Sequence, residues 1–137
     1  MASVTVSRTF DADPGTVRAA MSDTAAFMRG AGFDGVEYDG DRLHIENRVG
    51  MFDIELELDV LDTDAALAYE QVEGVFESMR TEYRVEGEAD GTTVTATTDY
   101  ESTRLAVVGS LLDESVVQRQ RRKELAAQFD WLAERVE

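Results

Sequence analysis

The sequence predicts an α+β fold with a seven-stranded antiparallel sheet, two short helices after the first strand, and a long C-terminal helix. Between residues 36 and 101, apolar and polar side chains alternate with a period of two, which is typical of strands with one buried face. From about residue 110 to the end, apolar residues recur at helical spacing instead. The 137 residues contain no internal repeat or linker, so we expect one domain over residues 1–137.

The N-terminal segment predicts one strand and two short helices. The stretch "SVTVSRTF" is rich in β-forming residues and predicts the first strand. Asp13 is a natural N-cap, and Pro14 suits the first helical position because its missing N–H costs nothing there. Ser22 or Asp23 can cap a second helix in "SDTAAFM", and the glycines of residues 29–35 end it.

The central segment is predicted to form a meander of hairpins. In "DRLHIENRV", Leu43, Ile45 and Asn47 share one face, and charged residues and His44 take the other. The stretch "MFDIELELDVL" repeats this alternation. Turn signals at "VGM", "DTD", "VEG" and "ADGT" separate the strands. Such short connections join antiparallel neighbours, so one face of the sheet is expected to be apolar and the other solvated.

The turns also predict which inward residues lie opposite each other. We expect two-residue turns at Gly50-Met51, Asp62-Thr63 and Asp90-Gly91, and a three-residue loop at residues 73–75. The resulting neighbours are Asn47 with Ile54, Ile45 with Leu56, Leu56 with Tyr69, Ile54 with Gln71, Tyr69 with Met79, Gln71 with Glu77, Tyr83 with Thr98, and Val85 with Ala96. A two-residue loop after residue 73 is the alternative, and it would turn Ser78 and Arg80 inward in place of Glu77.

The long helix carries the odd stretch "QRQRRKE" at residues 118–124, with four of the thirteen basic residues of an acidic chain. Helical phase splits this stretch. The predicted sheet-facing line runs through Val107, Leu111, Glu114, Gln118, Arg121, Leu125, Phe129, Leu132 and Val136. Arg119, Arg122 and Lys123 then lie on the surface. We expect Arg121 to belong to an internal cavity or to an ion pair within it.

Polar residues at inward positions indicate where a site lies. A buried polar group without a partner costs about 1–3 kcal/mol, so inward polar residues imply water, mutual pairing or a ligand. The predicted ligand-binding residues are Asn47, Ile54, Leu56, Tyr69, Gln71, Met79, Tyr100, Leu111, Glu114, Gln118 and Arg121. Glu77 and Glu114 are weak candidates for a general acid or base. Alternatively, Glu77 faces outward and Glu114 merely pairs with Gln118 and Arg121.

Composition excludes several classes of function. The chain has no cysteine and a single histidine, His44, so neither a metal site nor a cofactor is expected. His44 is expected on the outer, charged face of the sheet. The net charge of −16 opposes nucleic-acid binding. Scattered acidic residues are typical of cytoplasmic proteins of halophilic archaea, because molar salt screens their repulsion. No signal peptide or membrane span is predicted, which favours a cytoplasmic location.

The order of elements resembles the SRPBCC superfamily, which shares the START-like helix-grip fold. The resemblance rests on "VTVSRTFDADPGTVRAAMSD" and on "YRVEGEADGTTVTATTDYE" leading into the long helix, and it covers nearly the whole chain. The polyketide cyclase/dehydrase-like and coenzyme-Q-binding-like branch is the most similar. The resemblance implies a curved sheet wrapped around the C-terminal helix, with a cavity between them for a hydrophobic small molecule. It carries no catalytic signature.

Three functions follow from these expectations. The first is binding of a hydrophobic or aromatic small molecule, such as a quinone, lipid or polyketide-like compound. The second is a cyclase, dehydratase or hydrolase that uses acid and base side chains in the same cavity. The third is a protein-partner module without a ligand, in which the apolar stretch "LAVVGSLL" docks on another protein. Fold alone does not decide among them.

Overall fold

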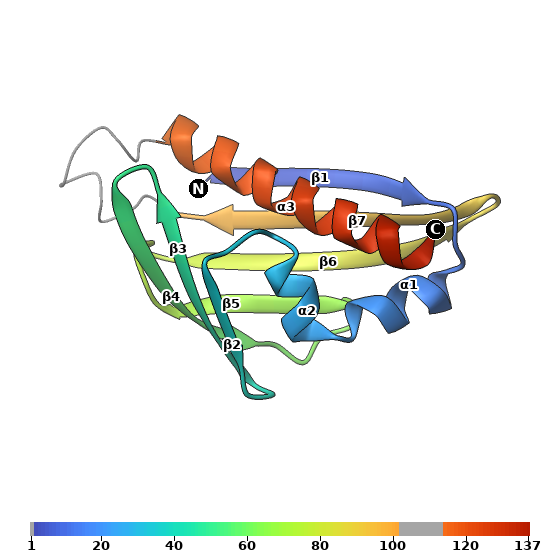
Figure 1. The fold of residues 1–137 in the computed structure, drawn as a ribbon, viewed down its shortest axis with the longest axis horizontal. Coiled ribbons are helices and arrows are strands. Elements are labelled where there is room, and N and C mark those ends of the chain that lie inside the picture. Colours follow the sequence, from blue (N-terminus) through green and yellow to red (C-terminus); the bar gives the residue numbers. More distant parts are fainter. Residues whose placement is uncertain (1, 102–113) are drawn as a thin grey trace.

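The computed structural model describes residues 2–101 and 114–137, which form a seven-stranded antiparallel sheet with helices on one face (Figure 1). The strand order is β1-β7-β6-β5-β4-β3-β2, so every neighbour except β1 and β7 is consecutive in the chain. The elements are β1 (Ala2–Phe10), α1 (Pro14–Met21), α2 (Thr24–Arg29), β2 (Gly35–Tyr38), β3 (Arg42–Val49), β4 (Phe52–Val60), β5 (Leu67–Glu73), β6 (Met79–Glu88), β7 (Gly91–Tyr100) and α3 (Glu114–Val136). The predicted α+β fold class is confirmed.

The two short helices begin where the sequence predicts. The Asp13 carboxylate accepts a hydrogen bond of 2.7 Å from the Thr16 backbone N–H, and Pro14 occupies the first turn of α1. Asp23, rather than Ser22, caps α2 by accepting from the Ala26 N–H. These caps satisfy backbone donors that a helix cannot pair internally.

The first predicted hairpin register is confirmed, and the later ones are wrong by an even number of residues. Asn47 lies opposite Ile54 as expected. Tyr69, however, lies opposite Val60 on β4 and Thr81 on β6, in place of Leu56 and Met79. Because side chains alternate along a strand, an even shift changes the neighbours but keeps the residues within the strands on their predicted faces.

The registers predicted from the turns after β4 and after β6 are wrong for two physical reasons. The loop after β4 spans residues 61–66, longer than the two-residue turn expected there, and β5 begins only at Leu67. In the last hairpin, the turn residues are Ala89 and Asp90, and Tyr83 lies opposite Ala96. Gly91 is instead the first residue of β7, where a Cβ atom would clash with the carbonyl oxygen of Phe10. The glycine serves close packing of β7 on β1 rather than the turn itself.

The pairing of β4 with β5 covers only part of β4. It begins at Glu57, which lies opposite Glu73, and the register shifts between Glu57 and Leu58. The loop that follows β5 is held by Gln71: its amide donates 2.8 Å to the Phe76 carbonyl and accepts 3.2 Å from the Phe76 N–H. A side chain therefore replaces the strand ladder at this point of the sheet.

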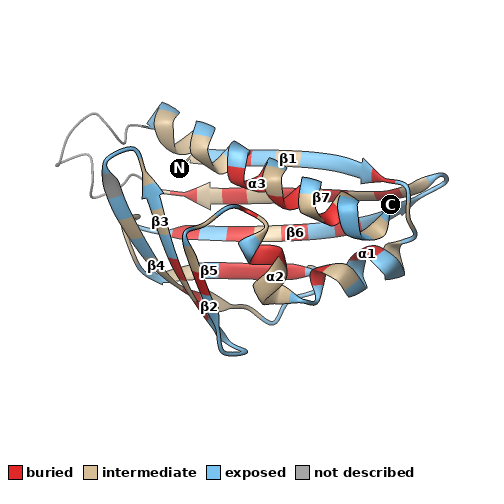
Figure 2. Cartoon of the chain, viewed as in Figure 1, coloured by how far each residue is buried: buried red, intermediate tan, exposed pale blue. Residues whose placement is uncertain are grey.

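The core lies between the sheet and the helices. Leu125, Phe129 and Leu132 on α3 are fully buried, as the helical spacing predicts. The Phe129 ring meets Phe10 edge-on, with ring centroids 6.0 Å apart. Figure 2 shows that buried positions on α3 begin midway along the helix, whereas its first turns are intermediate or exposed. No helix of the described residues is long and apolar enough to cross a membrane.

Candidate functional site

A cavity lies between the first half of α3 and the neighbouring strands. Its volume is about 80 Å³, which is room for several waters. Most of its lining is apolar. The lining residues are Met28, Phe33, Ile45, Asn47, Val49, Ile54, Leu56, Leu58, Tyr69, Val75, Phe76, Met79, Thr98, Tyr100, Val117, Gln120, Arg121 and Glu124.

One ion pair forms the polar wall of the cavity. Arg121 donates from Nη1 to Glu124 Oε1 at 2.9 Å, and the two side chains are only 11% and 10% exposed. The internal ion pair expected for Arg121 is therefore present. Arg119, Arg122 and Lys123 are exposed, also as expected.

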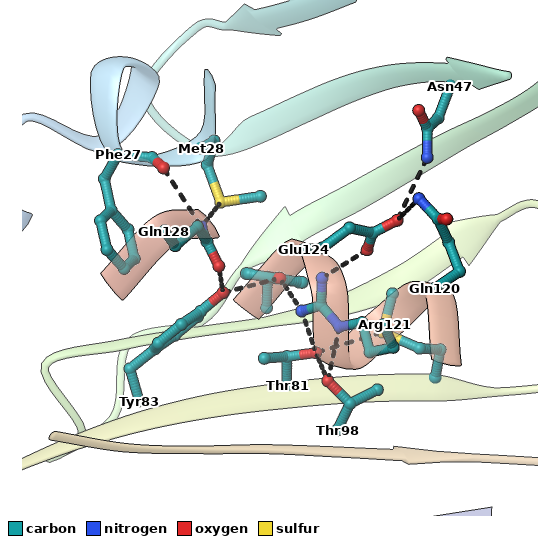
Figure 3. A network of polar contacts seen from close by, with 12 residues as sticks. Phe27, Met28, Asn47, Thr81, Tyr83, Thr98, Gln120, Arg121, Glu124 and Gln128 are labelled. Carbon is teal, nitrogen blue, oxygen red and sulfur yellow. Dashed lines mark hydrogen bonds and ion pairs between the residues drawn. The ribbon is translucent and has the colours of Figure 1, made fainter. Parts of the chain in front are cut away.

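Three further N–H groups of Arg121 donate to side chains of the sheet (Figure 3). Nε donates to Thr98 at 2.9 Å, and Nη2 donates to Thr81 at 3.2 Å and to the Tyr69 hydroxyl at 2.5 Å. Together with the bond to Glu124, these contacts use four of the five N–H groups of an arginine. Burial opposes the charged form, but Tyr69, Tyr83 and Glu124 outweigh it, and the net pKa of Arg121 is raised.

A chain of hydrogen bonds continues from Arg121 across the core. The Tyr83 hydroxyl donates to Gln128 Oε1 at 2.6 Å, and Gln128 Nε2 donates to the Phe27 carbonyl at 3.2 Å. The Tyr69 and Tyr83 hydroxyl oxygens lie 3.2 Å apart. Because the Tyr83 hydroxyl donates its hydrogen bond to Gln128, the Tyr69 hydroxyl must be the donor in its bond to Tyr83. Burial, followed by the proximity of Tyr69, raises the pKa of Tyr83 well above its usual value, so this chain is uncharged at Tyr83.

The second oxygen of Glu124 accepts from two amides. Gln120 Nε2 lies 3.0 Å from Glu124 Oε2, and Asn47 Nδ2 lies 3.1 Å from it. Gln120 comes from the same helix, whereas Asn47 comes from β3. This carboxylate thus connects α3 to β3 across the cavity.

Tyr100 adds a polar atom whose hydrogen bonding is unsatisfied within the described part of the chain. Its side chain lines the cavity and is 3% exposed, and its hydroxyl has no hydrogen-bond partner there. Burial, with a smaller contribution from Glu114, raises its pKa. Gln118 lies near enough to oppose this shift, but it forms no well-aligned bond with the hydroxyl.

The structure brings most of the predicted ligand-binding residues to the cavity. Those that line it are Asn47, Ile54, Leu56, Tyr69, Met79, Tyr100 and Arg121. Gln118 is half-buried outside the lining, and Leu111 lies outside the described residues. That any of these residues contacts a ligand stays a prediction.

Three predicted placements are wrong. Glu77 is exposed, because the loop after β5 is longer than expected and Met79 opens the next strand. Glu114 is exposed at the start of α3, one turn beyond the cavity lining. Gln71 is absent from the lining, because both ends of its amide bind the backbone of Phe76.

Sequence reasoning missed the most important polar residues, Glu124 and Gln128. Both are buried, yet they lie beside the single predicted line on the helix. A wider apolar stripe would have included them, because Glu124 follows Arg121 by three residues and Gln128 follows Leu125 by three. Phe33 and Phe76 line the cavity from loops, where no periodicity exists to indicate their direction.

The charged outer face of the sheet is separate from the cavity. His44 Nδ1 contacts Glu57, which is the main reason why the pKa of His44 is raised, and Nε2 lies 3.5 Å from Glu46. Ligand atoms of His44, Glu46 and Glu55 lie within 4.8 Å of one another. Both of these glutamates are exposed, and nothing beyond the cluster itself points to a metal ion. The outer-face position expected for His44 is confirmed.

Comparisons with known proteins agree on one fold. The chain matches the sequence model of the polyketide cyclase/dehydrase and lipid transport family over residues 1–137. No curated protein matches it.

Three solved structures illustrate the likeness. The Zhui aromatase/cyclase from Streptomyces sp. R1128 has a TM-score of 0.76 at 20% identity, covering 99% of this chain and 96% of that one. A START superfamily protein from Mycobacterium smegmatis has a TM-score of 0.73 at 16% identity, covering 98% and 96%. A conserved protein from Geobacillus kaustophilus has a TM-score of 0.70 at 15% identity, covering 99% and 98%. At these identities the likeness shows a shared fold alone.

Proposed function

We propose that this chain, which belongs to the polyketide cyclase/dehydrase and lipid transport family, binds one hydrophobic or aromatic small molecule in the cavity under α3. A quinone, a lipid or a polyketide-like compound is the class of ligand that the apolar lining suits. The SRPBCC resemblance inferred from the sequence is confirmed by this family and by the START-superfamily structure.

The observation that supports the proposal most is the composition of the cavity wall. Apolar residues from β3, β4 and the loop after β5 surround one cluster of polar side chains on α3, which consists of Gln120, Arg121 and Glu124. Small-molecule sites combine an apolar surface with a few placed polar atoms that fix orientation. Here Ile54, Leu56 and Met79 would supply the contact surface, and Asn47 and Tyr100 would fix orientation.

Catalysis in the same cavity has less support. The two carboxylates predicted as acid or base, Glu77 and Glu114, are both exposed. Glu124 is the one carboxylate among the described lining residues, and three side chains already donate to it. The stretch "LAVVGSLL" of the partner-module hypothesis falls on residues 105–112, outside the described residues.

Filling the cavity tests the proposal directly. Val117→Phe adds a ring to a lining position, and Val72→Phe adds the same ring at a side chain that is 51% exposed. Each variant and the wild type would be expressed in high salt and examined by native mass spectrometry, followed by thermal shift against quinones and lipids. We expect a co-purified mass or a ligand-induced shift for the wild type and for Val72→Phe, and neither for Val117→Phe.

Two outcomes would overturn it. One is a wild type with no bound mass and no shift from any compound. The other is a Val117→Phe variant that binds as the wild type does, which would place the ligand elsewhere.

A further inference from the structure

The one positively charged side chain among the described residues of the cavity wall, Arg121, is already paired within the protein. Among the described lining residues, Arg121 is the only basic one, and Glu124 neutralises it at 2.9 Å. Three of its other N–H groups donate to residues of the sheet. A carboxylate or phosphate ligand would therefore find no free cation here, and it would meet the negative charge of Glu124. Burying an unpaired anion is strongly unfavourable.

The free polar atoms of the wall are uncharged: two are amide oxygens, which only accept hydrogen bonds, and one is a hydroxyl, which can donate or accept. A carboxylate only accepts hydrogen bonds, so the amide groups of Asn47 and Gln120 must both turn their nitrogens toward Glu124. Their oxygens consequently point away from Glu124, as Figure 3 shows. Neither oxygen accepts a hydrogen bond from another side chain in the described part of the chain. The hydroxyl of Tyr100 is likewise uncharged and without a partner there.

Resting on the proposed function, we infer that the cavity selects uncharged hydrophobic molecules that carry a hydroxyl or N–H donor, and discriminates against anionic ones. The donor of the ligand would bind the oxygen of Gln120 or Asn47, and its apolar body would lie against Ile54 and Met79. Glu124 acts as a positioning residue, because it orients both amides and cancels the charge of Arg121. An arginine in an apolar cavity would otherwise indicate a fatty-acid or phosphate site.

Three bicyclic probes test separately the preference for a hydrogen-bond donor and the discrimination against a negative charge. Naphthalene, 2-naphthol and 2-naphthoate share one ring system but differ in donor and charge. Calorimetric titration at neutral pH, where 2-naphthoate is ionised, would give their dissociation constants. We expect 2-naphthol to bind about three- to tenfold more tightly than naphthalene, as one added hydrogen bond allows. It should bind at least about tenfold more tightly than 2-naphthoate.

Two variants test the assigned roles. Glu124→Gln leaves Arg121 charged and unpaired, so the affinity for 2-naphthoate should rise at least about tenfold relative to 2-naphthol. Gln120→Met removes one amide acceptor and should reduce the advantage of 2-naphthol over naphthalene, with naphthalene unchanged. Lys123→Met is the control, because Lys123 is exposed on the same helix and outside the lining. If Glu124→Gln fails to fold, the affinities of the wild type and of Gln120→Met for the three probes still test the proposed selectivity.

The outcomes distinguish this inference from the proposed function. If naphthalene binds but 2-naphthoate binds as tightly as 2-naphthol, the cavity is a ligand site without the selectivity, and the inference is wrong. If 2-naphthol has no advantage over naphthalene, the role assigned to the amide oxygens is wrong. If none of the three probes binds and the quinone and lipid panel also gives no shift, both proposals fall together.

Discussion

The two halves of α3 pack against the same sheet in opposite ways. The second half buries Leu125, Phe129 and Leu132 in the core, where the Phe129 ring meets Phe10 of β1 edge-on. None of its residues after Glu124 lines the cavity. In the first half, Val117, Gln120 and Arg121 line the cavity. One helix therefore supplies a densely packed end and an open end.

The difference shows how a cavity persists in a small fold. Apolar side chains collapse around empty space because close contact is favourable. Polar groups resist that collapse when each is fixed by several directed hydrogen bonds, as Arg121 and Glu124 are. The hydrogen bonds that join Tyr69, Tyr83 and Gln128 lie between the cavity and the packed end.

Breaking the ion pair should have the largest effect. Arg121→Met leaves Glu124 buried without its cation, and removal of one partner of a buried pair typically costs about 3–5 kcal/mol. Urea unfolding at fixed salt measures the change in the free energy of unfolding. The double variant Arg121→Met/Glu124→Met should recover much of that loss. Equal losses in the single and double variants would mean that the open end does not depend on charge pairing.

A matched pair of leucines compares the two ends directly. Leu132 is fully buried in the packed end, so Leu132→Ala should lower the free energy of unfolding by about 3 kcal/mol or more. Leu56 lines the cavity and is only partly buried, so Leu56→Ala should cost about 1 kcal/mol. The same urea titration serves for both. Similar losses at the two sites would remove the distinction between a packed and an open end.

The smallest effect is expected behind the open end, on the outer face of the sheet. His44 has a raised pKa, mainly because of its hydrogen bond to Glu57. The protonated form is thus favoured by folding, so its contribution is complete below the unfolded pKa of about 6.5 and disappears as pH rises through the higher folded value. His44→Gln should lower the free energy of unfolding by less than about 1 kcal/mol at pH 5 and by nothing at pH 9. A larger loss at pH 9 would contradict the sign of this shift.

The sequence was informative wherever periodicity is strong. The alternation of β3 and β4 predicted the inward direction of Asn47, the turn at Gly50-Met51 predicted their register, and the helical spacing predicted the burial of Leu125 and Phe129. The other turn signals were poorer guides. Asp90-Gly91 resembles a hairpin turn, but Gly91 is required by its contact with β1.

The polar network lay beyond sequence reasoning for a different reason. Glu124 and Gln128 are chemically ordinary residues for the exposed side of a helix, and exposure is the usual state of both types. Arg121 and Gln120 of the same helix supply part of the pairing of Glu124, but Asn47 of β3 and Tyr83 of β6 complete the networks of Glu124 and Gln128 from distant segments. Long-range hydrogen bonds of this kind leave no local pattern.

The incomplete pairing of β4 has a mechanical consequence. Residues 52–54 of β4 pair with residues 47–49 of β3, and in the ladders of the described residues neither segment has a further partner in β5 or β2, so they form a two-stranded ribbon at the end of the sheet. Val49 and Ile54 of this ribbon, together with Leu56 next to it on β4, form one wall of the cavity. A two-stranded ribbon twists and bends more readily than the interior of a sheet. The compliant wall of the cavity is therefore this ribbon, and a ligand too large for the present space would enter by flexing it while the helix and its packed end keep their positions.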